Sequence, residues 1–200
     1  MMKTLFAVAA LSISAPALAA VQVGAPAPDF EVMSATGEPV SLSDYRGQTV
    51  VLEWTNKGCP FVQKHYKTEN MQDLQSAAAD DGVVWLKVNS SAPGLQGHVD
   101  AAGARAETAD YETSETAYLL DADGTVGKLY NATATPHMYI VDGKGMLRYQ
   151  GAIDDRPTAA TGDVEGASNY VTLALVALDA GQDPSPAATR AYGCSVKYAE

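Results

Sequence analysis

Residues 49–62 read TVVLEWTNKGCPFV, and this stretch decides how the chain folds. An apolar run rich in β-branched residues is typical of a strand buried on both faces of a sheet, so we expect one at residues 49–54. Pro60 suits the first turn of a helix, because the N–H group that proline lacks has no partner there. The stretch therefore predicts a central strand, a short loop and a helix with Cys59 at its N-terminus.

Strand and helix patterns alternate along the rest of the chain. Two short strands joined by a turn come before the quoted stretch and predict a β-hairpin extension on the N-terminal side. The order of the later elements predicts an α/β fold with a mixed central β-sheet flanked by helices. The expected strands are residues 30–33, 39–42, 83–88, 118–120, 137–141 and 146–149. The helix that begins at Pro60 is expected to end near residue 82, and two further helices are expected at residues 97–106 and 125–130. A last helix should run from a cap at Ser168 or Asn169 to Gly181.

The first residues have the features of an export signal. Lys3 precedes a short apolar run at residues 5–13, and Ala-Leu-Ala at residues 17–19 matches the small residues of a cleavage site. The apolar run is shorter than the ~20 residues that a membrane span requires. We therefore expect a signal peptide at residues 1–19 and a periplasmic or secreted mature protein without a membrane span.

Length and charge narrow the classes of function. Two hundred residues suggest one domain, which we place at residues 20–182, followed by a C-terminal tail at residues 183–200 that carries Cys194. The formal net charge of −11 repels the phosphates of nucleic acids and the head groups of anionic lipids. Neither nucleic acid nor a membrane surface is therefore an expected partner.

The chain contains two cysteines, Cys59 and Cys194. Val62 occupies the position where a local CysxxCys pair would have its second thiol, so a partner for Cys59 must come from the far end of the chain. In an exported protein the two thiols are expected to form a structural disulfide or a redox pair, and both alternatives stay open. The tail after residues 183–186 has no clear secondary structure pattern, and such a segment is free to dock and undock.

Several segments resemble the redoxin branch of the thioredoxin superfamily. They are VGAPAPDF at residues 23–30, GCPFVQKHY at residues 58–66 and ATPHMYIVD at residues 134–142. Together with GCSVKY at residues 193–198, they are similar more narrowly to the peroxiredoxin-like proteins of the AhpC/TSA group. The resemblance covers residues 23–198 and implies a thioredoxin-like fold and a thiol-based oxidoreductase, with antioxidant peroxidase activity as one form.

The resemblance also implies roles for particular residues. Cys59 matches the attacking cysteine, and Thr135-Pro136 matches the cis-proline that thioredoxin folds place against it. Glu53 matches a buried acid beneath the redox pair; burial would fit it for proton relay, whereas the alternative is a solvated carboxylate at a strand end. The catalytic residues are thus expected to be Cys59, Cys194 and Glu53, and the substrate cleft Thr55, Lys57, Gly58, Pro60, Thr135, Pro136 and His137.

Two family patterns are incomplete in this chain. The peroxiredoxin pattern ProxxxThrxxCys places its proline on Leu52 and its threonine on Asn56. The arginine that peroxiredoxins carry on a later strand aligns with Pro136. Because Val62 also replaces the second cysteine of thioredoxins, neither parent mechanism carries over whole.

A reactive thiol at Cys59 needs a lowered pKa, because the thiolate is the attacking species. The N–H groups of the first helical turn and positive charge from Lys57, His65 and His137 are expected to supply it. The resulting hypothesis is an oxidoreductase that acts on peroxide or on disulfides and that an external thiol reductant or a disulfide partner protein regenerates. The alternative is a redox-silent binding protein, and no metal or cofactor is expected in either case.

Overall fold

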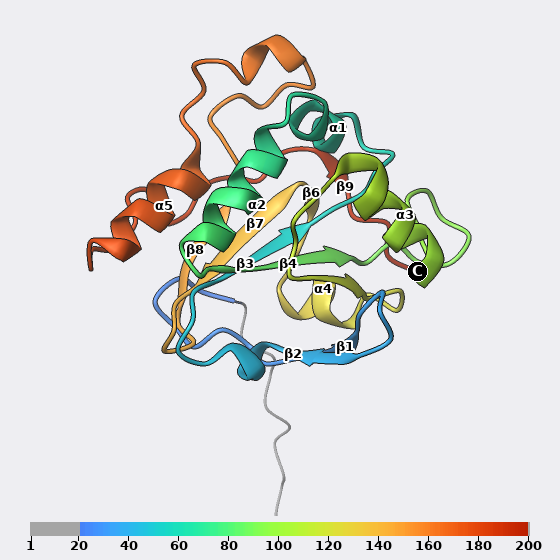
Figure 1. Ribbon diagram of the computed structural model, residues 1–200, viewed down its shortest axis with the longest axis horizontal. Coiled ribbons are helices and arrows are strands. Elements are labelled where there is room, and N and C mark those ends of the chain that lie inside the picture. The colour runs from blue at the N-terminus through green and yellow to red at the C-terminus, as the bar shows by residue number, and fades with distance from the viewer. Residues whose placement is uncertain (1–20, 200) are drawn as a thin grey trace, which may run out of the picture.

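A five-stranded sheet in the order β5-β4-β3-β7-β8 forms the centre of the computed structural model, which describes residues 21–199 (Figure 1). The middle strand, β3 (Val50–Trp54), runs parallel to β4 (Val84–Asn89), which is parallel to β5 (Ala117–Leu120). On its other side β3 is antiparallel to β7 (His137–Val141), and β7 is antiparallel to β8 (Leu147–Gly151). The predicted mixed sheet is confirmed, with its central strand within one residue of the expected bounds.

Both faces of the sheet are covered, which explains why every residue of β3, β4 and β7 is buried. One face carries α1 (Pro60–Lys67), α2 (Asn70–Asp80) and α5 (Tyr170–Asp179), whose side chains share one apolar core. The other face carries α4 (Thr125–Leu129) and the predicted N-terminal hairpin, whose strands are β1 (Glu31–Met33) and β2 (Pro39–Ser41). The α/β fold with flanking helices and a hairpin extension is therefore as predicted.

Successive residues of β3 enter these two cores in turn, as the period of a strand requires. Leu52 and Trp54 pack in the core beside α4 and the hairpin. Glu53 points the other way and accepts a hydrogen bond from Trp85 Nε1, and Trp85 belongs to the core beneath α1 and α2. The same helical core contains Cys59. A carboxyl group is thus placed inside the apolar layer that holds the candidate reactive thiol.

The third helix differs from its predicted position at residues 97–106. The structure places α3 at Ala101–Tyr111, where the Asp100 side chain caps it by accepting a hydrogen bond from the Gly103 N–H at 2.8 Å. Gly97 has a left-handed φ of 89° and lies in the preceding loop. The prediction was wrong at both ends because the helix lacks a clear apolar stripe. Two short 3-10 helices, η1 (Leu42–Tyr45) and η2 (Thr161–Asp163), complete the helical elements.

The tail beyond α5 returns to the sheet region and forms a strand, contrary to the expected lack of regular structure. Strand β9 (Cys194–Ser195) lies beside β6 (Ala134–Thr135) and pairs antiparallel with it (Figure 1). Within this pair Cys194 is opposite Thr135. Gly193 makes this approach possible, since a Cβ atom at that position would lie 2.0 Å from the Thr135 carbonyl oxygen. We call residues 189–198 the strap.

The predicted signal peptide at residues 1–19 lies outside the described residues. Within residues 21–199, no helix combines the length and the apolar character needed to cross a bilayer.

The cap of α5 yields a test of local stability. Asn169 Oδ1 accepts hydrogen bonds from the N–H groups of Val171 and Thr172 at 3.0 and 3.1 Å. We expect Asn169→Ala to lower the free energy of unfolding in urea by about 1 kcal/mol. Ser168→Ala, which changes the exposed neighbouring residue, is the matched control and should leave stability unchanged. Equal losses in both variants would contradict the assignment of the cap to Asn169.

Candidate active site

Cys59 lies where β3 passes into α1, and the loop before it is held by its own hydrogen bonds. Cys59 is the residue before the first helical turn, and Pro60 begins the helix, as the sequence predicts. The Cys59 N–H donates to the Asn56 carbonyl oxygen and the Gly58 N–H to Asn56 Oδ1, both at 2.9 Å. Asn56 Nδ2 in turn donates to Gln96 Oε1 at 2.9 Å. These hydrogen bonds therefore fix the backbone of Cys59 at the start of α1.

The Thr135–Pro136 peptide bond is cis, as predicted, and its threonine contacts the reactive sulfur. The Cys59 thiol donates a hydrogen bond to the Thr135 carbonyl oxygen, with Sγ and O 3.1 Å apart. Because Thr135 is also the residue opposite Cys194 in the β6–β9 pair, this segment touches one cysteine through its carbonyl group and pairs with the other.

The two cysteines lie next to each other as free thiols. Both lie against Thr135, Cys59 through a hydrogen bond to its carbonyl oxygen and Cys194 through the β6–β9 pair, so residues from opposite ends of the fold meet. Cys59 is 0% exposed, whereas Cys194 is half-buried. Cys59 is therefore shielded from solvent, and the strap pairs with the segment that its sulfur contacts.

Hydrogen bonds separate the pKa values of the two thiols. Burial raises the pKa of Cys59, but hydrogen bonds from the side chains of Cys194 and Thr135 oppose it. The backbone N–H groups of Val62, in the first turn of α1, and of Cys194 add to this effect, and together they lower the Cys59 pKa below its ordinary value. Burial and the contact with Cys59 raise the pKa of Cys194 to about 11. Cys59 is thus the thiol that ionises first, and Cys194 keeps its proton.

The expected positive charges do not act on Cys59. Burial lowers the pKa values of His65 and His137 to about 4, so both imidazoles are neutral near pH 7. Lys57 forms an ion pair with Asp110, with Nζ and Oδ2 2.6 Å apart. The prediction of a cationic environment was wrong, because these histidines are buried and the lysine is engaged elsewhere. Hydrogen-bond donors lower the thiol pKa instead.

Glu53 is a buried carboxyl group with several donors. It is 0% exposed and accepts hydrogen bonds from Tyr66 Oη at 2.7 Å, Trp85 Nε1 at 2.9 Å and Gln75 Nε2 at 3.3 Å. Burial raises its pKa, although the positive charge of Lys87 opposes the shift. The alternative of a solvated carboxylate at a strand end is excluded.

The residues expected to line the cleft differ in their exposure to solvent. Thr55, Thr135 and Pro136 are buried, whereas Gly58 and Pro60 are exposed on the surface. Of the remaining two, Lys57 is half-buried and pairs with Asp110, and His137 lines a pocket of about 840 Å³ that neither cysteine lines. The strap residues Tyr192, Gly193 and Ser195 also line this pocket. Of the seven residues expected to line one cleft, His137 alone lines this pocket.

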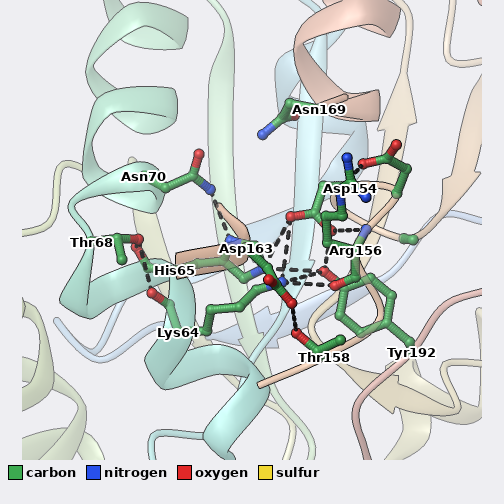
Figure 2. A network of polar contacts seen from close by, with 12 residues as sticks. Lys64, His65, Thr68, Asn70, Asp154, Arg156, Thr158, Asp163, Asn169 and Tyr192 are labelled. Atoms are coloured by element: carbon green, nitrogen blue, oxygen red, sulfur yellow. Dashed lines mark hydrogen bonds and ion pairs between the residues drawn. The ribbon is translucent and has the colours of Figure 1, made fainter. Parts of the chain in front are cut away.

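The sequence analysis missed a buried polar network beside the strap, which is drawn in Figure 2. It joins Lys64 and His65 of α1 to Asp154, which follows β8, and to Tyr192 of the strap. The sequence contained one indication of this network. Residues 64–66 are three consecutive polar or aromatic residues, and successive residues of a helix are rotated by ~100° around its axis, so these side chains cannot all face solvent. Nothing local indicated that they would meet Asp154 or Tyr192.

The fold and the cysteine site define a redoxin of the thioredoxin superfamily. The sequence model described as the AhpC/TSA family matches residues 23–150, and the chain belongs to this family. The thioredoxin-like protein YneN of Bacillus subtilis strain 168 is 30% identical over 128 residues, which are 64% of this chain and 70% of that protein. The matched family segment contains Cys59 and Pro136 but ends before the strap.

Solved structures share the fold. The hypothetical protein SMc02350 of Sinorhizobium meliloti 1021 is similar with a TM-score of 0.75 and 24% identity, covering 90% of this chain and 97% of that chain. An uncharacterized conserved protein of Geobacillus kaustophilus has a TM-score of 0.73 and 24% identity, covering 89% and 93%. A Chlorobium tepidum protein named as thiol:disulfide interchange protein DsbE has a TM-score of 0.54 and 24% identity, covering 66% and 85%. The predicted thioredoxin-like fold is confirmed.

The separation of the thiol pKa values predicts a titration. The thiolate absorbance of the reduced protein, after subtraction of the Cys59→Ser curve, should rise with a midpoint below the ~8.5 of a free cysteine. In Cys194→Ala the midpoint should move to higher pH, because a hydrogen bond to the thiolate is lost. Cys194→Ser keeps a hydroxyl donor and is expected to fall between the two. A wild-type midpoint at or above that of free cysteine would contradict the assignment.

Proposed function

We propose that this protein is an exported thiol–disulfide oxidoreductase in which Cys59 is the nucleophile and Cys194 the resolving thiol. The observation that carries the proposal is that both cysteines lie against Thr135: Cys59 Sγ is 3.1 Å from its carbonyl oxygen, and Cys194 is its partner in the β6–β9 pair. The predicted signal peptide at residues 1–19 supports export to an oxidising compartment, where stable disulfides form. The name of the DsbE structure, a thiol:disulfide interchange protein, supports the same reaction class.

The exchange proceeds in two displacement steps. The Cys59 thiolate attacks one sulfur of a partner disulfide, the partner's S–S bond breaks, and its second sulfur leaves as a thiolate that takes up a proton. Cys194 then loses its proton and attacks Cys59 Sγ in the mixed disulfide, which releases the other partner thiol. The partner disulfide is reduced to two thiols, and the protein dithiol is oxidised to Cys59–Cys194. An external thiol reductant reverses the protein's oxidation.

Glu53 fits the proton transfers that accompany these steps. The thiol of Cys194 carries a proton at neutral pH and must lose it before it attacks. Glu53 accepts hydrogen bonds from Tyr66 and Trp85, which belong to the same core as Cys59, and burial raises its pKa. We assign it the role of proton relay within the site.

Disulfide exchange fits the site better than peroxide reduction. A peroxide reaction would oxidise Cys59 to a sulfenic acid with release of water, and Cys194 would condense with it. The residue in the position of the peroxiredoxin threonine is Asn56, and its carboxamide is bound to Gly58 and Gln96. Pro136 takes the position of the peroxiredoxin arginine. The polar groups that would bind a peroxide in those enzymes are therefore replaced.

Mass spectrometry after acid quenching tests the assignment of the two roles. The fully reduced protein mixed with oxidised glutathione should lose two hydrogens and contain a Cys59–Cys194 disulfide. Cys194→Ser should accumulate one glutathione on Cys59, because the resolving thiol is absent, and Cys59→Ser should do neither. Inert thiols in the wild type would overturn the proposal in favour of a redox-silent binding protein.

A parallel arm of the same experiment uses hydrogen peroxide. We expect Cys59 to react with it no faster than a free cysteine thiolate at the same pH, because Asn56 and Pro136 replace the peroxiredoxin residues. A reaction faster by about a hundredfold, a factor typical of positioned catalytic groups, would assign peroxidase activity instead.

A further inference from the structure

We propose that Tyr192 is a positioning residue for the exchange reaction. Its hydroxyl group, bound to a buried charged network on α1 and after β8, holds the strap so that Cys194 stays against Cys59. The inference rests on the proposed function, since it names the residue that controls the resolving step of that reaction. It concerns contacts that lie outside the cysteine pair itself.

Three groups surround the Tyr192 hydroxyl (Figure 2). The hydroxyl donates a hydrogen bond to Asp154 Oδ1, and Lys64 Nζ donates to it at 3.2 Å. His65 Nε2 lies 3.3 Å from the same oxygen, while Asn70 Nδ2 donates to His65 Nδ1 at 2.9 Å. The neutral imidazole therefore carries its proton on Nε2 and donates it to Tyr192. The hydroxyl makes one donated and two accepted hydrogen bonds, which is all it can make.

The network that receives Tyr192 is buried and costly to disturb. The side chains of Lys64 and Asp154 are 0% and 2% exposed, with Nζ and Oδ2 3.5 Å apart. Lys64 also donates to the Arg156 carbonyl oxygen at 2.8 Å, and Asp154 Oδ1 accepts from the Arg156 N–H at 2.9 Å. Charges in such a site are stable only while their partners remain, so the network keeps one arrangement. Tyr192 is thus fixed to a rigid support.

That support belongs to the element that carries the reactive thiol. Lys64 and His65 are residues of α1, which begins directly after Cys59. Tyr192 is separated from Cys194 by Gly193 alone. One short helix therefore holds Cys59 at its start and, through Tyr192, the strap residue next but one to the resolving thiol. Because α1 fixes Cys59 directly and Cys194 through Tyr192, the effective concentration of one thiol near the other is raised for disulfide closure.

The opposite end of the strap is attached more simply. Tyr198 Oη donates to the Ala132 carbonyl oxygen at 2.8 Å, with no charged group among its hydrogen-bond partners in the described part of the chain. Between the two tyrosines, the backbone pairs with β6. Tyr198 therefore offers a matched comparison: it lies in the same strap and its hydroxyl makes one hydrogen bond, but it lacks the buried network.

Tyr192→Phe isolates the hydroxyl group. The ring contact with Phe61 of α1, at 5.9 Å between centroids, is kept, and only the three hydrogen bonds are lost. The strap then undocks more often, with two opposite effects. Closure of the Cys59–Cys194 disulfide from a mixed disulfide should slow by about tenfold, the loss that hydrogen bonds to charged groups produce. Alkylation of Cys59 in the reduced protein should become faster, because the strap covers it less often.

The experiment measures both rates and the equilibrium with glutathione in the full chain. The mixed disulfide between Cys59 and glutathione is formed at low pH, and its conversion to the internal disulfide is followed by rapid acid quenching. The equilibrium constant for disulfide closure should fall by about tenfold in Tyr192→Phe. Tyr198→Phe should change each quantity several-fold less than Tyr192→Phe does, since it removes a single hydrogen bond to a neutral carbonyl group.

The outcomes separate this inference from the proposed function. If the wild type forms no internal disulfide, the proposed function fails. If the wild type closes it and Tyr192→Phe closes it at the same rate, or if Tyr198→Phe slows it equally, only the role of Tyr192 is overturned. Urea unfolding of the reduced variants checks that they are folded. Should Tyr192→Phe not fold, Asp154→Asn, which removes the charge that accepts from Tyr192, should slow closure in the same direction.

Discussion

The site depends on one short backbone pairing, between Thr135 beside the cis-proline and Cys194 on the strap. It brings together two thiols that are 194 − 59 = 135 residues apart in the sequence. Closing so long a segment costs conformational entropy, which local contacts must offset. Gly193 permits the close approach, and contacts on both sides of it hold the strap. Without this pairing, Cys59 would be a single thiol at the start of a helix.

The electrostatics of the site follow from the same arrangement. Cys59 is buried, and burial alone would keep its thiol protonated. Donors from the first turn of α1 and from Cys194 reverse this effect without any positively charged side chain. The pKa of Glu53 is raised and that of His65 is lowered for the same reason, which is their burial away from solvent. Hydrogen bonds, rather than positively charged side chains, therefore lower the pKa of the Cys59 thiol.

Burial gives the strap two roles in the proposed exchange reaction. Because Cys59 is 0% exposed, the proposal requires the strap to move aside when a disulfide partner binds and to be in place for resolution. The anchors must hold it firmly enough for closure and still release it. A network of buried charges at one end and a simple hydrogen bond at the other meet both needs, since local opening is drawn from the weaker contacts of a fold.

The sequence by itself determined the fold class, the placement of Cys59 at a helix N-terminus, the cis-proline opposite it and the hairpin extension. The strands, the helix start and the hairpin follow from local patterns such as apolar runs of strand length and Pro60 in the first turn, whereas the cis-proline was implied by the resemblance of Thr135-Pro136 to thioredoxin folds. The tertiary structure alone decided that the tail forms β9, that His65 and His137 are neutral, and that Lys64, Asp154 and Tyr192 meet. Burial and desolvation are sums over neighbours from distant parts of the chain, and no local pattern contains them.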